Sequence, residues 1–470
     1  MANLLEAYKN RLTISESVHQ KTHNGAKMSA QKKLMIASVL NNTSRFMNEA
    51  FDNSAATQRS ALGDYKKFCL NVSTVALPNL ILPELMLTQP MTSISGYVTY
   101  LKYTLGTAKG GVAENAFVAD SYRLGEMTAD RAAYTADKVV ETVTKETATV
   151  NLSWTPVVAG VFGKNDDGTT RDVKITRANG DVEFITLAKD AEGKITATSV
   201  TPTDALQNGD RIAYAYDNVI VPQKMALPTL KAELDSIDLH AHARRIAVYY
   251  SQIAAFQAKT DYGMDLADQL SAQAQGELAY EIDTEGVLML NDGAEFDSTL
   301  NFPSYEKSIE DTATGSFISR SQYYEQFSEI VARAKKIIYK RTQKFAPNYM
   351  VVGANVLTVL PYAKGWTAAP ASTVNGPYFA GTLDGMKVYC SPSIDDNRFF
   401  FGVNGSDLQT SAAVYAPYMA IVPTQLLGFA DGAMSQGFST MYDMKLLSTY
   451  EKANHTYSHL LVAGKFDVVE

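Results

Sequence analysis

The sequence predicts an α+β protein in which one long helix joins two dissimilar parts of the chain. Apolar residues recur at helical spacing over residues 261–287, near the middle of the 470 residues, which predicts a long amphipathic helix. Before this helix, residues 139–222 alternate as strands do. After it, a second helical pattern at 319–344 precedes short strand-like runs, which is typical of mixed α and β structure.

The long helix is predicted from apolar residues at four-residue intervals. Asp265 and Asp268 place negative charge where a helix N-terminus favours it, and Gly286 is expected to end the helix. Because the apolar stripe must be buried against a core, polar substitution of Leu270 or Leu278 is expected to abolish soluble folding. The stripe comprises Leu266, Leu270, Ala274, Leu278 and Ile282, widened by Ala267 and Ala279.

The N-terminal part contains a helical stretch and an apolar run. Residues 1–60 favour helix and are mildly basic, with Lys32 and Arg45 among apolar residues, which indicates an amphipathic helix or an arm that orders on a partner. Residues 77–91 carry prolines at positions 78, 83 and 90, which break a regular helix. We expect this run to be extended and to lie against another surface, of its own chain or of a neighbouring copy.

Residues 139–222 differ from the neighbouring sequence in having strand-like alternation of apolar and polar residues. The run at 172–187 has the pattern of a hairpin, in which Asn179 and Gly180 can take the positive φ that a tight turn requires. We expect an all-β module inserted between two strands of a larger unit, because the runs on either side of it read as separated partners. These runs are 96–105 and 224–237.

The second helix, at 319–344, collects its basic residues near the C-terminal end. The helix dipole favours cations there, so we interpret this basic cluster as a solvated face and not as a nucleic-acid-binding patch. Strand-like runs follow the helix at 348–353, 387–392, 398–403, 412–423, 439–450 and 459–469.

Composition argues against several classes of function. The net charge of −8 does not suit a protein that binds nucleic acid by neutralising phosphates. Cys69 and Cys390 are the only cysteines, so we expect no disulfide framework and a reducing compartment. The charged N-terminus does not resemble a signal peptide, and the longest apolar run, at 413–422, is shorter than the ~20 residues of a membrane helix. We expect a protein that is soluble and intracellular when made.

The histidines and cysteines form no recognised metal-binding or catalytic motif. His240 and His242 would share a face on a strand, and His455 and His459 would share a face on a helix, but neither pair has a cysteine nearby. Cys390 lies in an apparent strand and is expected to be a buried, inert thiol. We therefore expect structural roles for these residues.

The remaining candidate motifs also favour structure over catalysis. Asp395 and Asp396 lie in an expected turn, where such residues are common. The glycines at 106–111 lack the Gly-Lys-Ser/Thr of a phosphate-binding loop, and Gly-x-Ser-x-Gly is absent. His19 and His23 lie in the polar N-terminal region and are given no role. We predict no catalytic, cofactor-binding or metal-binding residue, no cofactor and no ATP hydrolysis.

Six blocks of sequence carry a family resemblance. They are QPMTSISGYVTYLKYTLG at 89–106, YGMDLADQLSAQAQGELAYEID at 262–283, NYMVVGANVLTVL at 348–360, YFAGTLDGMKVYC at 378–390, RFFFGVNGSD at 398–407 and AAVYAPYMAIVP at 412–423. In this order they resemble the major capsid proteins of T-even-like tailed bacteriophages. The resemblance covers residues 77–138 and 224–447, and its most specific points are Gln-Pro-Met at 89–91 and Tyr-Ala-Pro-Tyr at 415–418.

The resemblance implies the α+β capsid fold of tailed phages, the Hong Kong ninety-seven fold, with a long spine helix and an inserted all-β domain. By analogy, the chain divides into an N-terminal arm at 1–95, an E-loop with flanking strands at 96–138 and 223–260, an inserted β domain at 139–222, the spine helix of the P-domain at 261–289, an A-domain at 290–438, and a return to the P-domain at 439–470.

The implied function is structural and not enzymatic. Members of this family self-assemble into an icosahedral-type head shell that encloses packaged double-stranded DNA without sequence-specific binding. The resemblance implies hexameric capsomers, with pentamers left open. It also implies portal, scaffold, vertex or decoration proteins as partners, no membrane, assembly in the bacterial host cytoplasm and a final place in the virion. Leu4-Leu5-Glu6 and Met47-Asn48-Glu49 loosely match the apolar-x-Glu sites at which such proteins are trimmed by a protease.

Several alternatives remain open at this stage. An encapsulin-like nanocompartment protein would share the fold, although the inserted domain and the long N-terminal arm favour a virus. A hydrolase with an unrecognised site is a further alternative. The apolar run at 77–87 could be buried on a neighbouring copy. A set of tyrosines is equally compatible with interfaces and with the core, namely Tyr349, Tyr362, Tyr378, Tyr415 and Tyr418.

Overall fold

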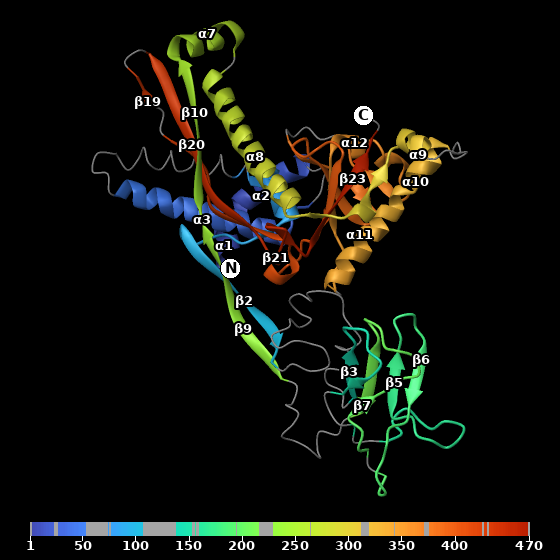
Figure 1. Ribbon diagram of the computed structural model, residues 1–470. Helices are drawn as coiled ribbons and strands as arrows, with labels where there is room; N and C mark the ends of the chain where they lie inside the picture. The colour runs from blue at the N-terminus through green and yellow to red at the C-terminus, as the bar shows by residue number, and fades with distance from the viewer. Residues whose placement is uncertain are drawn as a thin grey trace. The chain divides into compact units, whose positions relative to one another are not determined.

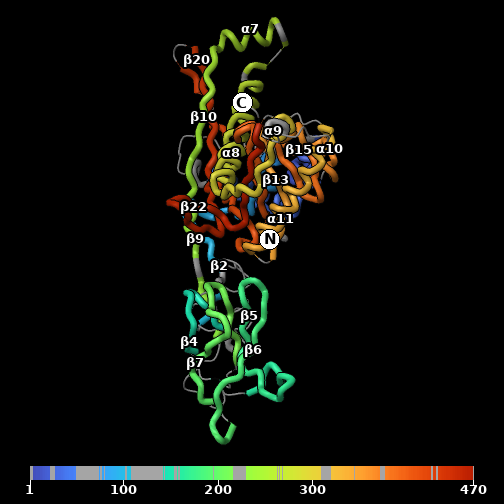
Figure 2. Tube along the Cα trace, turned by 45° about the vertical axis from the view of Figure 1, so that its right-hand side comes forward, coloured from blue at the N-terminus to red at the C-terminus, as the bar shows by residue number. Residues whose placement is uncertain are grey.

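The computed structural model separates into two compact units. Unit 1 consists of Met1–Tyr100 and Ser236–Glu470, and unit 2 of Leu101–Asp235. Figures 1 and 2 show helices and sheets mixed in unit 1. The structure describes residues 2–22, 27–52, 74, 77–106, 138–152, 156, 159–193, 195–215, 229–263, 265–311, 319–342, 344–370, 376–424, 427–429 and 432–468.

The first sheet of unit 1 is built on long antiparallel strands, and the long helix covers one of its faces. Its elements are β1 (Leu87–Thr88), β10 (His242–Ser251), β18 (Ala413–Pro423), β19 (Leu427–Gly428), β20 (Ala433–Leu446), α7 (Gln252–Tyr262) and α8 (Leu266–Asp292). The strand order is β1-β18-β20-β10, with β19 also beside β20. Ile246 of β10 pairs with Phe438 of β20, and both pack against Leu278 of α8.

The predicted long helix is confirmed as α8, but it begins at Leu266 and not at Asp261, and it ends later than expected. Asp265 is its N-cap and accepts a hydrogen bond from the Asp268 backbone N–H. Gly286, expected to end the helix, is instead buried inside it. A Cβ at this position would overlap the Leu82 side chain, so the glycine permits a close approach of another segment.

Replacing Gly286 with alanine is expected to destabilise unit 1, although alanine is the better helix former. The overlap with Leu82 forces a shift that costs about 1–3 kcal/mol. Gly276 of the same helix has open space at its Cβ position, so Gly276→Ala is the matched control and should stabilise by about 0.5–1 kcal/mol. Urea unfolding of both variants measures whether each substitution raises or lowers the free energy of unfolding. Changes of the same sign would contradict the close packing of Leu82.

The N-terminal part of the chain is helical, as predicted, and packs on the first sheet. Its helices are α1 (Ala2–Ala7), α2 (Lys9–Thr22), α3 (Ala30–Asp52), η1 (Leu77–Asn79) and α5 (Leu82–Leu85). The Asn42 side chain on α3 donates to the carbonyls of Met91 and Tyr418 at 2.6 and 3.1 Å. Thr43 accepts from the Ala420 N–H of β18 at 3.3 Å. These bonds fix α3 to the sheet.

The run at 77–91 is not extended, which corrects the sequence-based prediction. Pro83 lies in the first turn of α5, where proline is tolerated because the N–H it lacks would have no partner. Leu80, Leu82 and Leu85 are buried within unit 1. The apolar run therefore belongs to the core of its own chain and is not free to be buried on a neighbour.

The second sheet of unit 1 holds most of its buried aromatic residues. Its strands are β11 (Glu295–Phe296), β12 (Phe302–Pro303), β13 (Tyr349–Val352), β14 (Trp366–Ala368), β15 (Tyr378–Leu383), β16 (Met386–Cys390), β17 (Arg398–Gly402) and β23 (Leu461–Asp467). The order is β11-β23-β17-β13-β16-β15-β14, with β12 also beside β23. Phe399, Phe400 and Phe401 are all buried, because β17 is an interior strand covered on both faces.

Helices surround this second sheet. They are η2 (Ser298–Leu300), α9 (Tyr305–Asp311), α10 (Arg320–Glu325), α11 (Phe327–Thr342), α12 (Ala354–Leu357) and η3 (Leu360–Tyr362). A further short helix, η4 (Leu408–Thr410), packs through Leu408 with Val414 and Ala416 of the first sheet. The single helix predicted at 319–344 is divided at Gln326 into α10 and α11. Ser319 begins α10 with a capping box to Gln322.

Strand pairing shows where the chain passes from one sheet to the other. A hairpin of β21 (Thr449–Lys452) and β22 (His455–Ser458) separates β20 of the first sheet from β23 of the second. The expected boundary between residues 438 and 439 falls inside β20. The segment 439–470 also contains β23, which pairs with β17.

Unit 2 contains a small β structure with its own core. Its strands are β3 (Lys138–Thr142), β4 (Val150–Asn151), β5 (Val173–Thr176), β6 (Val182–Ile185), β7 (Ser199–Val200) and β8 (Arg211–Ala215). Val173, Ile212 and Tyr214 are buried in one cluster. The predicted hairpin is present as β5 and β6, but only Gly180 of the two turn residues takes a positive φ, of 96°.

Two long strands connect the chain of unit 1 with that of unit 2. β2 (Ser95–Leu105) pairs with β9 (Leu230–His240), and the division between the units crosses both strands. The predicted partners at 96–105 and 224–237 are therefore confirmed as a pair of strands. Residues 224–228 of that prediction lie outside the described residues.

Candidate assembly surfaces and the N-terminal junction

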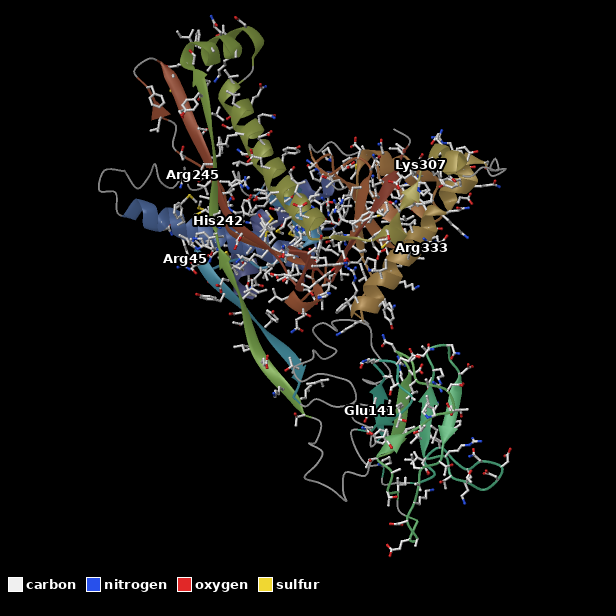
Figure 3. All side chains as sticks on the ribbon, viewed as in Figure 1. Arg45, Glu141, His242, Arg245, Lys307 and Arg333 are labelled. Carbon is white, nitrogen blue, oxygen red and sulfur yellow. The ribbon has the colours of Figure 1, made fainter. Side chains whose placement is uncertain are left out.

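The two histidine pairs do not form metal sites. His240 ends β9 and His242 begins β10, and their exposed rings lie 5.4 Å apart edge to face (Figure 3 labels His242). His455 is in β22 and His459 follows it in a turn, so the two do not lie on a helix that would place them on one face. Among the described residues, no group of three or more His, Cys, Asp or Glu side chains is placed to hold a metal ion.

Cys390 and the aspartate pair occupy the environments predicted for them. Cys390 is buried in β16, and this burial raises the pKa of its thiol, so the reactive thiolate is disfavoured. Asp395 accepts a hydrogen bond from the Asn397 backbone N–H at 3.0 Å, which is the turn geometry expected of it. His23 and Cys69 lie outside the described residues. No helix in the described part of the chain is both long and apolar enough to cross a membrane.

The basic end of α11 is only partly solvated, which corrects the sequence-based interpretation. Arg341 forms an ion pair with Glu295 and donates to the carbonyl of Leu461 at 3.2 Å, so it ties the helix to β11 and β23. Lys335 pairs with Asp384 in the turn between β15 and β16. These side chains position α11 on the second sheet.

Five polar side chains meet where the N-terminal helices reach α8, and we call this set the N-terminal junction. It comprises Lys32 of α3, Glu84 of α5, Asp283 of α8, and Lys387 and Tyr389 of β16. Lys32 and Asp283 are buried. Charged groups are buried only at a large cost in free energy unless their hydrogen bonds are made, so their contacts identify what the junction does.

Asp283 caps a helix that has no cap of its own. Its carboxylate accepts from the backbone N–H groups of Ile81 at 3.1 Å and Leu82 at 3.2 Å, at the start of α5. Ile81 occupies the N-cap position and has no side chain that could accept these bonds. From the other side, Lys32 Nζ donates to the carbonyl of Leu80 at 2.9 Å. The segment 80–82 is therefore held between α3 and α8.

Glu84 is the negatively charged partner of the lysines in the junction. It accepts from Lys387 Nζ at 2.8 Å and from the Tyr389 hydroxyl at 2.6 Å. Burial alone would raise the pKa of Glu84, but the charges of Lys32 and Lys387 and these hydrogen bonds lower it to about 2. Glu84 is thus ionised at neutral pH and supplies the counter-charge for both lysines.

Burial acts in opposite directions on the two innermost groups. It lowers the pKa of Lys32 to about 8, although Glu84 and Asp283 partly offset this. It raises the pKa of Asp283 to about 7 against the two backbone hydrogen bonds and the charge of Lys32. The contacts of Lys32 and Asp283 with the segment 80–82 join the N-terminal helices to α8.

A groove follows the C-terminal half of α8. It has a volume of about 690 Å³, and its lining includes Glu285 and Leu288 of α8, Arg244 of β10 and Leu446 of β20. Arg244 lies 2.6 Å from Glu285, which also accepts from the Tyr442 hydroxyl at 2.5 Å. These contacts hold α8 on the first sheet beside the groove.

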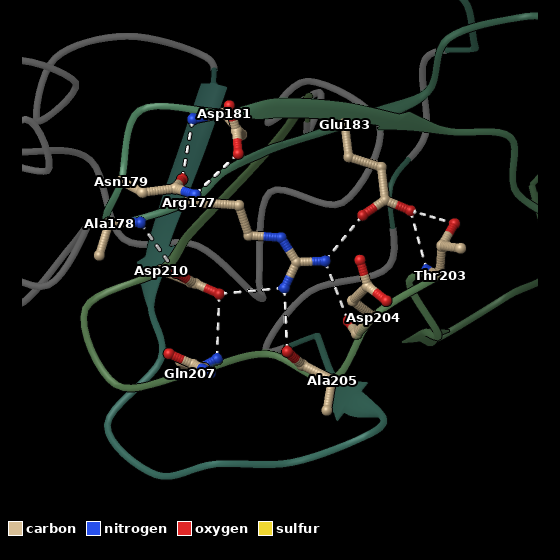
Figure 4. A network of polar contacts seen from close by, with 10 residues as sticks. All are labelled: Arg177, Ala178, Asn179, Asp181, Glu183, Thr203, Asp204, Ala205, Gln207 and Asp210. Carbon is tan, nitrogen blue, oxygen red and sulfur yellow. Dashed lines mark hydrogen bonds and ion pairs between the residues drawn. The ribbon is translucent and has the colours of Figure 1, made fainter.

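One arginine organises the loops of unit 2 (Figure 4). Arg177 pairs with Glu183 at 2.8 Å and with Asp210 at 3.1 Å, and it donates to the carbonyls of Asp204 and Ala205. Asp210 is buried and also accepts from the backbone N–H groups of Ala178 and Gln207, which are each 2.9 Å away. The network fastens the turn after β5 to the loop before β8.

Replacing Arg177 with methionine is expected to destabilise unit 2 by about 1.5–3 kcal/mol, because the buried Asp210 carboxylate loses its charged partner and two carbonyls lose a donor. Lys145→Met is the matched control, since Lys145 is exposed and this change should be nearly neutral. Limited proteolysis across 177–181 and 203–210 reports local opening, and equal cleavage rates in the two variants would contradict the role of Arg177.

Comparison with known proteins identifies the family. The family model described as Major capsid protein Gp23 matches residues 63–464. The chain belongs to the Gp23 major capsid protein family. It is 26% identical over 419 residues to the major capsid protein of Enterobacteria phage T6, covering 83% of this chain and 79% of that protein. It is also 26% identical over 420 residues to the major capsid protein of Enterobacteria phage T4, and this match covers 83% of this chain and 76% of that protein.

A solved structure from Mycobacterium phage Che8 is also similar. It is 17% identical, covers 53% of this chain and 79% of that chain, and has a TM-score of 0.34. Family membership confirms that this capsid protein has the α+β capsid fold of tailed phages and that it is a structural protein of the head shell, not an enzyme. Many copies assemble into the capsid of the virion. The encapsulin-like and hydrolase alternatives are less well supported.

The tyrosines left open by the sequence divide between core and surface in this capsid protein. Tyr349 and Tyr415 are buried in β13 and β18, so they are core residues. Tyr362 is exposed, and Tyr378 and Tyr418 are half-buried. Only the last three are available for contacts with other subunits.

Sequence reasoning missed the N-terminal junction altogether. Lys32 lies in a mildly basic helix, where a lysine is normally solvated, and Asp283 lies among polar residues of α8. One signal was present: Asp283 follows Ile282 of the apolar stripe directly, so it lies at the margin of the buried face.

Proposed function

We propose that this capsid protein assembles through hexameric capsomers into a closed, icosahedral-type shell that holds double-stranded DNA without reading its sequence. The observation that carries this proposal is the match of one capsid family model to residues 63–464. The net charge of −8 supports a container role, because phosphate neutralisation would require a basic surface. Portal, scaffold, vertex or decoration proteins are the proposed partners, and the host cytoplasm is the proposed place of assembly.

The proposal assigns a role to each part of the chain. Residues 1–95 act as the N-terminal arm, 139–222 as the inserted domain, and α8 as the spine of the P-domain. The segments 96–138 and 223–260 act as an E-loop that reaches a neighbouring subunit. Its exposed apolar residues, Tyr97 of β2 and Leu230 and Leu234 of β9, support this role. Residues 290–438 act as the A-domain, and residues 439–470 return to the P-domain.

Weak and repeated contacts are sufficient for such a shell. Once a ring begins to close, later contacts become effectively intramolecular, so each one can be modest. Extended strands suit this mode of assembly because they reach across a neighbour without requiring a large flat face.

Electron microscopy and sedimentation velocity of the purified protein test the proposal. Closed shells, or rings of six subunits that convert into shells as concentration rises, are expected. A protein that stays monomeric at all concentrations and ionic strengths, while circular dichroism shows it to be folded, would contradict assembly. ATP hydrolysis that is lost on substitution of one carboxylate would contradict the structural role.

A further inference from the structure

Five large apolar side chains are exposed where β10, β19, β20 and α7 meet. Figures 1 and 2 both show α7 and the ends of β10 and β20 projecting beyond the rest of unit 1. We call this set the distal apolar surface. Its members are between 50% and 71% exposed, and they are Tyr249, Ile253, Phe256, Leu427 and Phe429.

Strand register places two of these residues, Tyr249 and Leu427, on one side of the sheet. Tyr249 pairs with Ser435, and Ser435 pairs with Leu427, so the three side chains point to the same face. The neighbouring residue Val248 points to the opposite face and packs on α8. Phe429 is held by a hydrogen bond from its N–H to the carbonyl of Ala433 at 2.8 Å. The part of the surface formed by Tyr249, Leu427 and Phe429 is therefore held in place by main-chain hydrogen bonds.

Helix α7 extends this surface but has little packing within its own chain. It has 11 residues, and isolated helices shorter than about 12–15 residues are marginal in water. Ile253 and Phe256 lie on one side and are exposed, while Ala255 and Ala258 are only half-buried. Gly263 ends the helix in the left-handed conformation. A helix this short depends mainly on the packing of its apolar side chains for stability.

The size of the distal apolar surface fits a contact between proteins. Its five side chains expose roughly 600 Å². Monomeric proteins rarely leave larger contiguous apolar patches in water, and a partner in a standard interface contributes about 800 Å². A contact of this size is weak alone and effective when it is repeated, which is what a shell requires.

We propose that the distal apolar surface docks on a second copy of this chain in the assembled shell. The inference rests on assembly of many copies, which makes other copies the most abundant neighbours of every subunit. In the contact, Phe256 and Ile253 of α7 are removed from water, and α7 becomes fully stable only after assembly.

Substitution on α7 tests the proposal. The double variant Ile253→Gln with Phe256→Gln keeps helix-favouring residues and removes the apolar surface. We expect folded subunits by circular dichroism and at least a tenfold rise in the concentration needed for shells to form. Ile14→Gln, at an exposed apolar position on α2, is the matched control and should assemble normally. Normal assembly of the double variant, or an equal defect in both, would overturn the proposal.

Crosslinking identifies the occupant of the surface. A photoreactive phenylalanine analogue placed at position 256 should crosslink in assembled shells to a peptide of a second copy, as found by mass spectrometry. A crosslink to a different virion protein, or none at all, would overturn the assignment of a second copy. A wild-type protein that forms no shells under any condition would instead contradict the assembly function on which the inference rests.

Discussion

Replacing Leu278 with aspartate is expected to prevent unit 1 from folding into a soluble subunit. Leu278 is buried between α8 and the first sheet, where it packs with Ile421 and Phe438. An unpaired carboxylate there costs more than the 5–15 kcal/mol by which a typical domain is stable, or it is forced to stay protonated. The milder Leu278→Ala should cost about 2–5 kcal/mol in urea unfolding.

Leu270 is the matched control, because it lies on the same predicted stripe but is only half-buried. Leu270→Asp should therefore yield soluble, folded subunits, which corrects the expectation that both leucines are equally essential. Soluble yield and circular dichroism distinguish the two variants. Folded Leu278→Asp subunits that merely fail to assemble would show that this face meets another copy.

Replacing Asp283 with alanine is expected to lower the free energy of unfolding by about 2–3 kcal/mol. The backbone N–H groups of Ile81 and Leu82 lose their acceptor and stay buried. The N-terminal helices should be released first, because the segment 80–82 links them to α8. Urea unfolding and hydrogen exchange of 77–87 measure the two effects. Unchanged protection of this segment would contradict the capping role.

The pH dependence of Asp283→Asn isolates the charge of this residue. The pKa of Asp283 is about 7 in the folded protein, against about 3.9 in an unfolded chain. Between these values the folded state holds a proton that the unfolded state has lost, so this group makes stability fall as pH rises from about 4 to about 7. The asparagine side chain cannot ionise, so the variant should gain stability relative to wild type as pH rises through this range. Urea unfolding of both proteins at a series of pH values measures the difference, and parallel stability curves would contradict the raised pKa.

The elements that sequence predicted well are those governed by local periodicity. The stripe through Ala274, Leu278 and Ile282 was predicted from side-chain spacing, and so were four strands of the second sheet, β13, β16, β17 and β23. The hairpin of β5 and β6 follows from Asn-Gly between two alternating runs. Family resemblance added the function, which no spacing could supply.

The failures share one cause, which is contact between distant parts of the chain. Gly286 is a helix breaker by local rules, but its role is to admit Leu82. Pro83 led to the prediction that this run is not helical, but in the structure it lies in the first turn of α5, where proline is tolerated. Lys32 and Asp283 are ordinary surface residues in sequence and become buried through partners far away. A single sequence does not show which distant segment of the chain will pack against a given residue.

The position of β23 has a consequence for synthesis on the ribosome. It follows the other strands of the second sheet in the chain, yet it lies inside that sheet between β11 and β17. Until residues 461–467 emerge, β17 presents an unpaired edge that is rich in phenylalanine. A nascent chain therefore cannot complete the second sheet until β23 has left the ribosome, so this part of unit 1 folds last.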